Sequence, residues 1–252
     1  MMERLKDEVA VVTGGAQGIG AAYALALAKA GAKGAIGDVA DTGAVQASLE
    51  AVGGTTFCSR LDVTDPESVN EFVRLTEEKL GNISILVNNA ALFSSLETMP
   101  FTEISSGEWD KVMAVNVRGS FEVAKAVVPS MRSNGRGSII NIASISSFVD
   151  LVEVAAYAAA KAGIFGISMT AAKEWARYGI RSNTVSFGVV ETPMTEVVRS
   201  EKFREDILSR IALGYWAEPL EVVRPVAFLL SDSASYITGQ NLGIDGGMNI
   251  NI

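Results

Sequence analysis

The chain has 252 residues, a formal net charge of −8 at pH 7, one cysteine and no histidine. The acidic balance, without any Lys/Arg cluster, argues against a nucleic-acid-binding protein, which needs a basic surface to meet the phosphates. Cys58 alone can form neither an internal disulfide nor a Cys/His zinc site, and the lack of histidine excludes a Ser-His-Asp triad.

Short apolar runs alternate with longer helical patterns along almost the whole chain. We expect strands at residues 9–13, 34–37, 55–61, 83–88, 138–142, 181–186 and 241–244. We expect helices at residues 18–30, 41–52, 65–80, 107–132, 154–178 and 220–230. Strands that alternate with helices imply βαβ crossovers. The sequence therefore predicts an α/β fold, a doubly wound parallel sheet of about seven strands with helices on both faces, in a single domain that spans residues 1–252.

Glycine and proline mark several of the element ends. Gly31, Gly81 and Gly179 follow helical runs, where glycine ends helices well, and Asp65-Pro66 fits an N-cap followed by proline at the first helical position. Residues 188–217 fit the alternation worst, because they are long, mixed in composition and lack a strand pattern. We expect this segment to be a lid over a substrate site.

A glycine-rich turn follows the first predicted strand and opens into an alanine-rich helix, with the sequence Thr13-Gly-Gly-Ala-Gln-Gly-Ile-Gly20. Free backbone N–H groups and the helix dipole at such a turn both favour an anion. Gly14, Gly18 and Gly20 permit a tight turn and the close approach of a pyrophosphate. The position between strand and helix favours dinucleotide binding over a purely structural turn.

Asp38 ends the second predicted strand, eighteen residues after Gly20, close to where a carboxylate meets the adenosine ribose of a dinucleotide. Its charge would repel a 2′-phosphate. No Lys or Arg follows it directly, and Gln17 rather than a basic residue precedes Gly18, so the sequence favours NAD over NADP. The alternative is that Asp38 or Asp41 only caps the next helix.

Tyr157 and Lys161 are spaced i, i+4 in a predicted helix, and Ser144 lies thirteen residues before the tyrosine. This spacing places the phenol and the ammonium on one helix face. A free tyrosine has a pKa of about 10, so it needs nearby positive charge to act as a base at neutral pH. Lys161 would supply one charge and an oxidised nicotinamide another. The alternative for the isolated pair is a surface contact.

The sequence combines the glycine turn at 13–20 with Asn88-Asn89-Ala90 after the fourth strand, Asn116, Ser144 and Tyr157-x-x-x-Lys161. With these motifs in this order, it resembles the short-chain dehydrogenase/reductase family over essentially its whole length. The resemblance extends to Asp62-Val63 and to Asp245-Gly246-Gly247. Its glycine spacing is similar to that of the shorter, single-domain type. The resemblance implies a Rossmann-type fold and metal-free hydride transfer with a nicotinamide dinucleotide.

The resemblance also implies residue roles. Tyr157 would be the general acid/base, Ser144 would hydrogen-bond the substrate oxygen, and Lys161 would lower the pKa of the tyrosine and hold the nicotinamide ribose. Asn116 would hold a water in a proton relay through Lys161. The expected cofactor-binding residues are Gly14, Gln17, Gly18, Ile19, Gly20, Asp38, Asp62, Val63, Asn89, Ala90, Tyr157, Lys161, Gly188, Val190 and Thr192.

The expected substrate residues are Ser144, Ser146, Phe148, Phe93, Met194 and Tyr215. Other positions that we expect near the pocket are Leu92, Ser147, Val149, Val154, Val197, Phe203 and Trp216. Most are apolar, which indicates an uncharged, hydrophobic ketone or secondary alcohol. Alternatively, several of them only pack the lid or a subunit interface. Arg199 and Lys202 are either contacts for an anionic group or solvated lid residues.

The sequence departs from the family pattern at Ala91, Ala160 and Phe187, where glycine, serine and proline are common. None of these changes removes a catalytic group, but Phe187 leaves the backbone path to Val190 and Thr192 less fixed than proline would.

These observations predict an NAD-dependent short-chain alcohol dehydrogenase or carbonyl reductase. The alternatives are a 3-ketoacyl (acyl-carrier-protein) reductase, which usually prefers NADPH and a basic docking patch, and a non-catalytic dinucleotide-binding regulator. The resemblance also implies a homotetramer packed through the helices near 107–132 and 154–178. Without about eighteen consecutive apolar residues or an apolar leader, we expect a cytoplasmic protein with no membrane partner.

Overall fold

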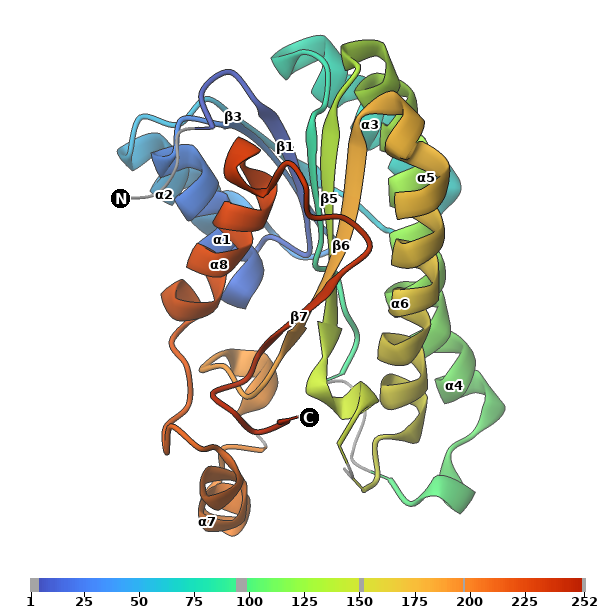
Figure 1. Ribbon diagram of the computed structural model, residues 1–252, viewed down its shortest axis with the longest axis vertical. Helices are drawn as coiled ribbons and strands as arrows, with labels where there is room; N and C mark the ends of the chain where they lie inside the picture. Colours follow the sequence, from blue (N-terminus) through green and yellow to red (C-terminus); the bar gives the residue numbers. More distant parts are fainter. Residues whose placement is uncertain (1–4, 94–98, 150–151, 197, 251–252) are drawn as a thin grey trace.

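The computed structural model describes residues 5–93, 99–149, 152–196 and 198–250. Within them, seven parallel strands form one sheet in the order β3-β2-β1-β4-β5-β6-β7 (Figure 1). The strands are β1 (Val9–Thr13), β2 (Lys33–Asp38), β3 (Thr56–Arg60), β4 (Ile85–Asn88), β5 (Gly137–Ser144), β6 (Ile180–Phe187) and β7 (Asn241–Ile244). This arrangement confirms the predicted doubly wound α/β fold, in which the strand order reverses between β1 and β4.

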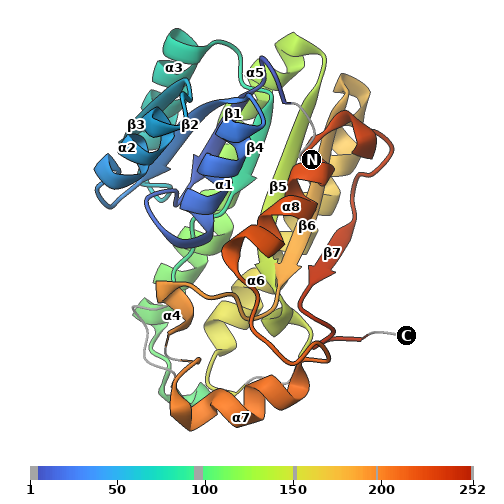
Figure 2. The ribbon, with the colours of Figure 1, turned by 90° about the vertical axis from the view of Figure 1, so that its left-hand side faces the viewer.

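Helices cover both faces of the sheet. They are α1 (Gly18–Lys29), α2 (Gly43–Ala51), α3 (Pro66–Leu80), α4 (Ser106–Met113), α5 (Ser120–Asn134), α6 (Ala155–Trp175), α7 (Glu201–Arg210) and α8 (Pro219–Leu230). Helices α1, α2 and α8 lie on one face, and α3, α5 and α6 lie on the other (Figures 1 and 2). Short 3₁₀ turns lie at Phe101–Glu103, Ile145–Ser147, Ala176–Tyr178, Pro193–Thr195 and Asp232–Ala234.

The core is split by the sheet into two layers because alternate strand residues face opposite ways. Val11 and Val12 are adjacent in β1 and fully buried, yet they belong to different layers. The first layer contains Val12, Leu27, Ile36, Val222 and Val226. The second contains Val11, Phe72, Leu86, Val127 and Ile139. The near-continuous apolar runs of the central strands therefore follow from burial on both faces.

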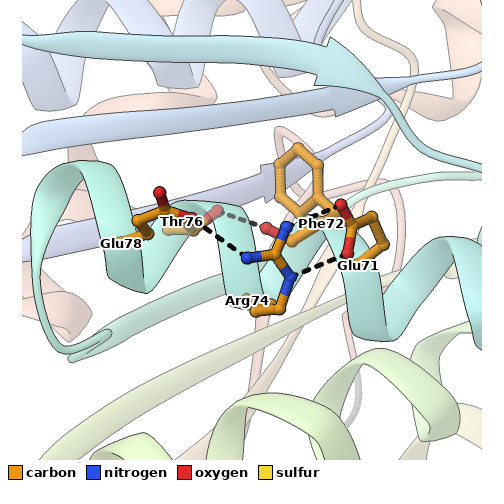
Figure 3. A network of polar contacts seen from close by, with 5 residues as sticks. All are labelled: Glu71, Phe72, Arg74, Thr76 and Glu78. Carbon is orange, nitrogen blue, oxygen red and sulfur yellow. Dashed lines mark hydrogen bonds and ion pairs between the residues drawn. The ribbon is translucent and has the colours of Figure 1, made fainter.

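Helix α3 shows how one helix divides its faces between core and solvent. Phe72 and Thr76 are buried, and the Thr76 hydroxyl donates to the Phe72 carbonyl at 2.8 Å. On the exposed face Arg74 pairs with Glu71 at 2.8 Å and with Glu78 at 3.0 Å (Figure 3). Exposed pairs of this kind add little stability, so the apolar face holds the helix in place.

The predicted element ends are largely confirmed. Gly31, Gly81 and Gly179 have φ values of 94°, 99° and 72°, and the Asp65 side chain accepts the Glu67 N–H as an N-cap. Residues 107–132 are helical as predicted, but a π-helical turn at Ala114–Gly119, which carries Asn116, separates α4 from α5. Hydrophobic periodicity does not reveal such a turn, because the helical backbone continues through it.

The predicted lid segment, residues 188–217, contains the 3₁₀ turn Pro193–Thr195 and helix α7, which the sequence pattern did not indicate. Its two ends meet, since Val190 and Ala217 form an isolated parallel bridge. Helix α7 lies beyond the carboxyl ends of the strands (Figure 2). Among the described residues, no helix is long and apolar enough to span a bilayer.

Candidate active site

A cleft of about 580 Å³ opens at the carboxyl ends of the central strands. It runs from Asp38, past the glycine turn, to Tyr157 and the lid. The predicted site residues on its wall are Gly14, Gln17, Gly18, Ile19, Gly20, Asp38, Asp62, Val63, Asn89, Ala90, Phe93, Ser144, Ser146, Tyr157, Lys161, Gly188, Val190, Thr192 and Met194. Residues that lie far apart in the sequence are thus brought together where ligands bind in open α/β sheets.

The glycine turn is packed too tightly for side chains. A Cβ on Gly20 would lie 2.1 Å from the Gly14 carbonyl oxygen, and one on Gly14 would lie 2.8 Å from the Ala90 Cα. The α1 N-terminus that follows has no side-chain cap and no acidic residue in its first turn. Its free N–H groups and dipole therefore suit a phosphate, and the cleft around them fits a dinucleotide.

Thr13 and Asn89 hold this turn against β4. The Asn89 side chain donates to the Thr13 and Gly14 carbonyls at 3.0 and 2.9 Å. The Thr13 hydroxyl accepts the backbone N–H groups of Asn89 and Ala90 at 3.1 and 3.0 Å. Sequence reasoning gave Thr13 no role of its own. Its place at the start of the glycine motif was the available signal.

Asp38 lies at the adenosine end expected of a dinucleotide. Its carboxylate accepts the Ala16 N–H and the Ala40 N–H, each at 2.9 Å, so it also ties the glycine turn to β2. Arg60 is the β3 partner of Asp38 in the sheet register, and its guanidinium donates to the Val39 carbonyl at 3.0 Å. A cation therefore lies beside Asp38, which sequence proximity did not reveal.

Asp62 and Val63 form the next part of the wall. The Asp62 carboxylate accepts the Thr64 hydroxyl at 2.7 Å and the Thr64 N–H at 3.0 Å, and these bonds lower the pKa of Asp62. Val63 packs against Gly119, where a Cβ would lie 2.6 Å from the valine Cγ2. The glycine thus lets the π-helical turn approach the cleft wall.

Tyr157, Lys161 and Ser144 converge at the other end of the cleft, from α6 and the end of β5. The Ser144 hydroxyl lies close enough to the Tyr157 phenol to act on its pKa, and Ser144 Oγ accepts the Ser146 N–H at 3.1 Å. The Lys161 ammonium lies 5.6 Å from the centre of the Tyr157 ring. The pair is therefore not a surface contact, since Lys161 is only 3% exposed.

Burial shifts both of these groups toward their neutral forms. It raises the pKa of Tyr157 to about 12, although the Ser144 hydroxyl acts to lower it. Burial also lowers the pKa of Lys161 to about 7. The direction for Tyr157 is opposite to the sequence-based expectation, because within the protein alone desolvation of the phenolate outweighs the nearby polar groups.

Asn116 does not line the cleft. Its amide donates to the Val112 carbonyl at 2.9 Å and to the Leu92 carbonyl at 3.2 Å, while its Oδ1 is buried without a protein partner among the described residues. Its backbone carbonyl accepts the Ser120 hydroxyl at 2.9 Å. The structure thus shows Asn116 joining the π-helical turn to the segment after β4.

Gly188, Val190 and Thr192 reach the cleft as expected. A Cβ on Gly188 would lie 2.8 Å from the Asp245 Cα, so glycine is needed where these two segments of the chain pass close to each other. Phe187, which stands in place of the common proline, is the last residue of β6 and is buried. Phe187 pairs with Ile244 of β7 in the sheet, and this pairing fixes the backbone at the position where proline is common.

The expected substrate residues divide into two groups. Phe93, Ser146 and Met194 line the cleft, with Leu92, Val154 and Phe203 nearby on the same wall. Phe148 and Tyr215 do not line it, contrary to expectation.

Each of these two side chains has a partner elsewhere. Phe148 is 45% exposed and packs on Phe165, and the Tyr215 hydroxyl donates to Glu221 at 2.9 Å. Trp216 is buried outside the cleft, and Val197 lies outside the described residues. Hydrophobicity alone could not separate residues that face the cleft from residues that pack the lid.

Comparisons with known proteins agree with this geometry. A family model described as "Enoyl-(Acyl carrier protein) reductase" matches residues 14–249. A 3-oxoacyl-[acyl-carrier-protein] reductase from Thermotoga maritima is 41% identical over 249 residues, which cover 98% of this chain and 100% of the relative. A 2,5-dichloro-2,5-cyclohexadiene-1,4-diol dehydrogenase from Sphingobium indicum is 38% identical over 254 residues, which cover 100% of this chain and 100% of the relative.

Solved structures show the same fold. Levodione reductase superposes with a TM-score of 0.91 at 34% identity, covering 97% of this chain and 98% of that one. A structure described as a "putative NAD(P) dependent gluconate 5-dehydrogenase from Beutenbergia cavernae", with NADP bound at low occupancy, gives a TM-score of 0.91 at 35% identity. The match covers 97% of this chain and 98% of that one.

Proposed function

This chain is an oxidoreductase of the short-chain dehydrogenase/reductase family, and we propose that it interconverts a secondary alcohol and a ketone using NAD. One observation carries the proposal. The hydroxyl of Tyr157, the hydroxyl of Ser144 and the ammonium of Lys161 converge at one end of a cleft that runs past a phosphate-type glycine turn to Asp38.

The residues divide the chemistry among them. A nicotinamide dinucleotide, when bound, supplies the hydride acceptor or donor and, in its oxidised form, a positive charge beside the phenol. In alcohol oxidation the Tyr157 oxygen takes the hydroxyl proton, and in ketone reduction it returns that proton to the developing alkoxide. Ser144 donates to the same substrate oxygen and stabilises its charge. Ionised Lys161 favours the phenolate.

Asn116 belongs to the proposed proton relay. Its position supports this role indirectly, because it lies in a π-helical turn packed against α6, the helix that carries Lys161. π-Helical turns occur often at functional sites. The amide bonds to Val112 and Leu92 hold the turn in place.

The preference for NAD rests on Asp38, which lines the cleft at the end expected for the adenosine. A 2′-phosphate would bring two like charges together there. Arg60 lies beside it and would favour a phosphate, and one solved relative holds NADP. The proposal assigns the greater effect to Asp38, because Asp38 is on the cleft wall and Arg60 is not.

The cleft wall around Tyr157 supports an uncharged, hydrophobic substrate. Its apolar members include Leu92, Phe93, Met194, Phe203 and Ile207. A wall of this kind favours apolar surface on the ligand, while Ser144 and Tyr157 offer polar contacts to its oxygen. The charged residues Glu153, Asp206 and Arg210 also line the cleft.

The proposal includes a homotetramer, with α4, α5 and α6 as packing surfaces. Trp109, Phe121 and Met169 on these helices are 38%, 47% and 53% exposed. Exposed large apolar side chains of this kind are common at subunit interfaces. Light scattering during size-exclusion chromatography would test it, and a monomeric mass would contradict it. A cytoplasmic location stays a prediction.

A second candidate is reduction of a 3-ketoacyl group carried on acyl carrier protein. The 41% identity to the Thermotoga maritima reductase favours it. Asp38 and the net charge of −8 oppose it, because such enzymes usually use NADPH and an acidic carrier protein docks on basic surface. Faster turnover of acetoacetyl carrier protein than of free ketones would establish this candidate instead. The third reading, a non-catalytic regulator, is disfavoured because Ser144, Tyr157 and Lys161 are all present.

Initial rates test the main proposal directly. We would follow NADH and NADPH absorbance with a panel of cyclic and linear ketones, diketones and the corresponding alcohols. Turnover with NADH that greatly exceeds turnover with NADPH is expected. Cofactor binding without turnover of any compound would instead favour the regulatory alternative.

A further inference from the structure

Arg199 is joined to the turn that carries Val190 and Thr192. Its Nη2 donates to the Thr192 carbonyl at 3.1 Å, and its Nε donates to the Thr195 hydroxyl at 3.2 Å. Both acceptors lie in residues 190–195, which we call the lid turn. One guanidinium therefore holds two separate points of the same short segment, and its planar shape suits such paired contacts.

The Thr195 hydroxyl is the centre of the lid turn. It accepts the Thr192 N–H at 3.3 Å as well as the Arg199 Nε–H, and it donates to the Val190 carbonyl. The Thr192 carbonyl and hydroxyl also lie within hydrogen-bond distance of it, at 3.1 and 3.3 Å. A hydroxyl has one proton to donate and two lone pairs to accept with, so the Arg199 donor helps to decide which of these contacts form.

The lid turn meets the glycine turn across the cleft. The Thr192 Cβ and Cγ2 lie 3.7 Å from the place where a Cβ on Gly18 would stand. Thr192 is only 7% exposed and lines the cleft with Val190. A shift of the lid turn would therefore change the width of the cleft between the glycine turn and the lid.

Arg199 also links the lid turn to the rest of the lid. Its guanidinium lies 5.9 Å from the centre of the Trp216 ring, and Arg204 of α7 lies 4.7 Å from the same ring. Trp216 is buried and directly precedes Ala217, which bridges to Val190. The ring thus provides a common support for α7 and for the base of the lid turn.

We propose that Arg199 is a positioning residue that sets the lid turn for the nicotinamide end of the dinucleotide. The inference rests on the proposed function, in which Val190 and Thr192 contact the cofactor and the nicotinamide must lie at the Tyr157 end of the cleft, where the lid is. Arg199 acts through Thr192 and Thr195. Removing its two donors should weaken binding of the nicotinamide half and leave binding of the adenosine and phosphate half nearly unchanged, because Asp38 lies at the far end of the cleft and the glycine turn is held by Asp38 and Asn89 rather than by the lid turn.

Two ligands separate these halves. NADH contains the nicotinamide, whereas ADP-ribose has only the adenosine, the pyrophosphate and a ribose. In Arg199→Met the Kd for NADH should rise roughly 10-fold, as expected when a charge-assisted hydrogen bond is lost, while the Kd for ADP-ribose should change less than about 2-fold. Arg199→Lys keeps the charge but not the fork of donors, so it should restore only part of the difference. Fluorescence titration and calorimetry measure both constants.

Arg177→Met is the matched control, because Arg177 stacks on Tyr178 at 4.8 Å and is not on the cleft wall. It should change neither constant. If Arg199→Met does not fold, Thr195→Val removes the hydroxyl from the same network and should show the same split. Equal loss of both ligands, or no loss of either, overturns the inference. Wild-type protein that binds neither NADH nor NADPH would instead overturn the proposed function.

Discussion

The ring of Phe93 packs edge-on against the ring of Tyr157, with centroids 4.8 Å apart and planes at 61°. Phe93 comes from the segment after β4 and Tyr157 from the first turn of α6, so the contact joins two elements around the candidate catalytic phenol. The phenylalanine keeps water from one side of that phenol. It therefore contributes to the burial that raises the pKa of Tyr157 to about 12.

This contact predicts a pH dependence. Alcohol oxidation requires the deprotonated phenol, so its rate should rise with pH up to the pKa of Tyr157, and ketone reduction should be favoured at lower pH. Phe93→Ala admits water and favours the phenolate, so the midpoint of the oxidation profile should move to lower pH by roughly half a unit or more. The positive charge of the bound oxidised nicotinamide lowers this pKa, so initial rates between pH 6 and 10 should contain the midpoint and measure its shift. Phe148→Ala, outside the cleft, should leave the midpoint in place, and an unmoved midpoint in Phe93→Ala would refute the idea.

Tyr157→Phe removes the proposed acid/base while keeping the ring. We expect the variant to fold, to bind NADH and to lose at least the roughly 10²–10⁴-fold in kcat that is typical of a general acid/base. Tyr23→Phe is a matched control, because Tyr23 is buried in α1, its hydroxyl has no partner among the described residues, and it is not on the cleft wall. It should retain full activity. Retention of more than about a tenth of the rate by Tyr157→Phe would eliminate the assignment.

Lys161 predicts a link between stability and pH. Burial lowers its pKa from 10.5 to about 7, and its ammonium donates to the Ile142 carbonyl at 2.8 Å. Between these pH values the unfolded chain holds a proton that the folded protein has released, so this residue's contribution to stability rises with pH. Below about pH 7 both states are protonated, and the folded state bears the full cost of burying the charge.

Lys161→Met removes this titration. The free energy of unfolding of the variant minus that of the wild type should therefore fall by on the order of 2–4 kcal/mol between pH 7 and pH 10. Urea denaturation at several pH values measures both proteins, and the groups that they share cancel in the difference. A difference independent of pH would show that Lys161 keeps an ordinary pKa in the folded protein.

Much of the fold was predictable because it depends on local pattern. The alternation of buried strands and amphipathic helices gave the sheet, and Gly31, Gly81 and Gly179 marked helix ends through positive φ. The cleft wall followed from motif positions, since parallel strands bring their carboxyl ends to one edge. Asp65 behaved as an N-cap for the same local reason.

The remaining features depend on contacts that sequence patterns do not encode. Tyr215 bonds to Glu221 instead of facing the cleft, and helix α7 lies in a segment without clear periodicity. The net pKa shift of Tyr157 depends on burial in three dimensions, which outweighs the nearby polar groups. Arg60 comes beside Asp38 only through the register of β2 and β3.

That register leads to a prediction about cofactor choice. Asp38→Ser removes the charge that opposes a 2′-phosphate and leaves Arg60 at the edge of the site. We expect kcat/KM with NADH to fall about 10-fold and kcat/KM with NADPH to rise about 10-fold or more, each a change of about 1.4 kcal/mol.

The double variant Asp38→Ser/Arg60→Ala separates two causes of that change. If Arg60 attracts the 2′-phosphate, the gain with NADPH should largely disappear, whereas the loss with NADH should stay the same. Raising the ionic strength should reduce the gain in the single variant, because Arg60 is exposed and its charge is screened by salt. Arg74→Ala, on the exposed face of α3, controls for removal of a surface cation. A gain that persists in the double variant would mean that loss of the Asp38 charge alone admits NADPH.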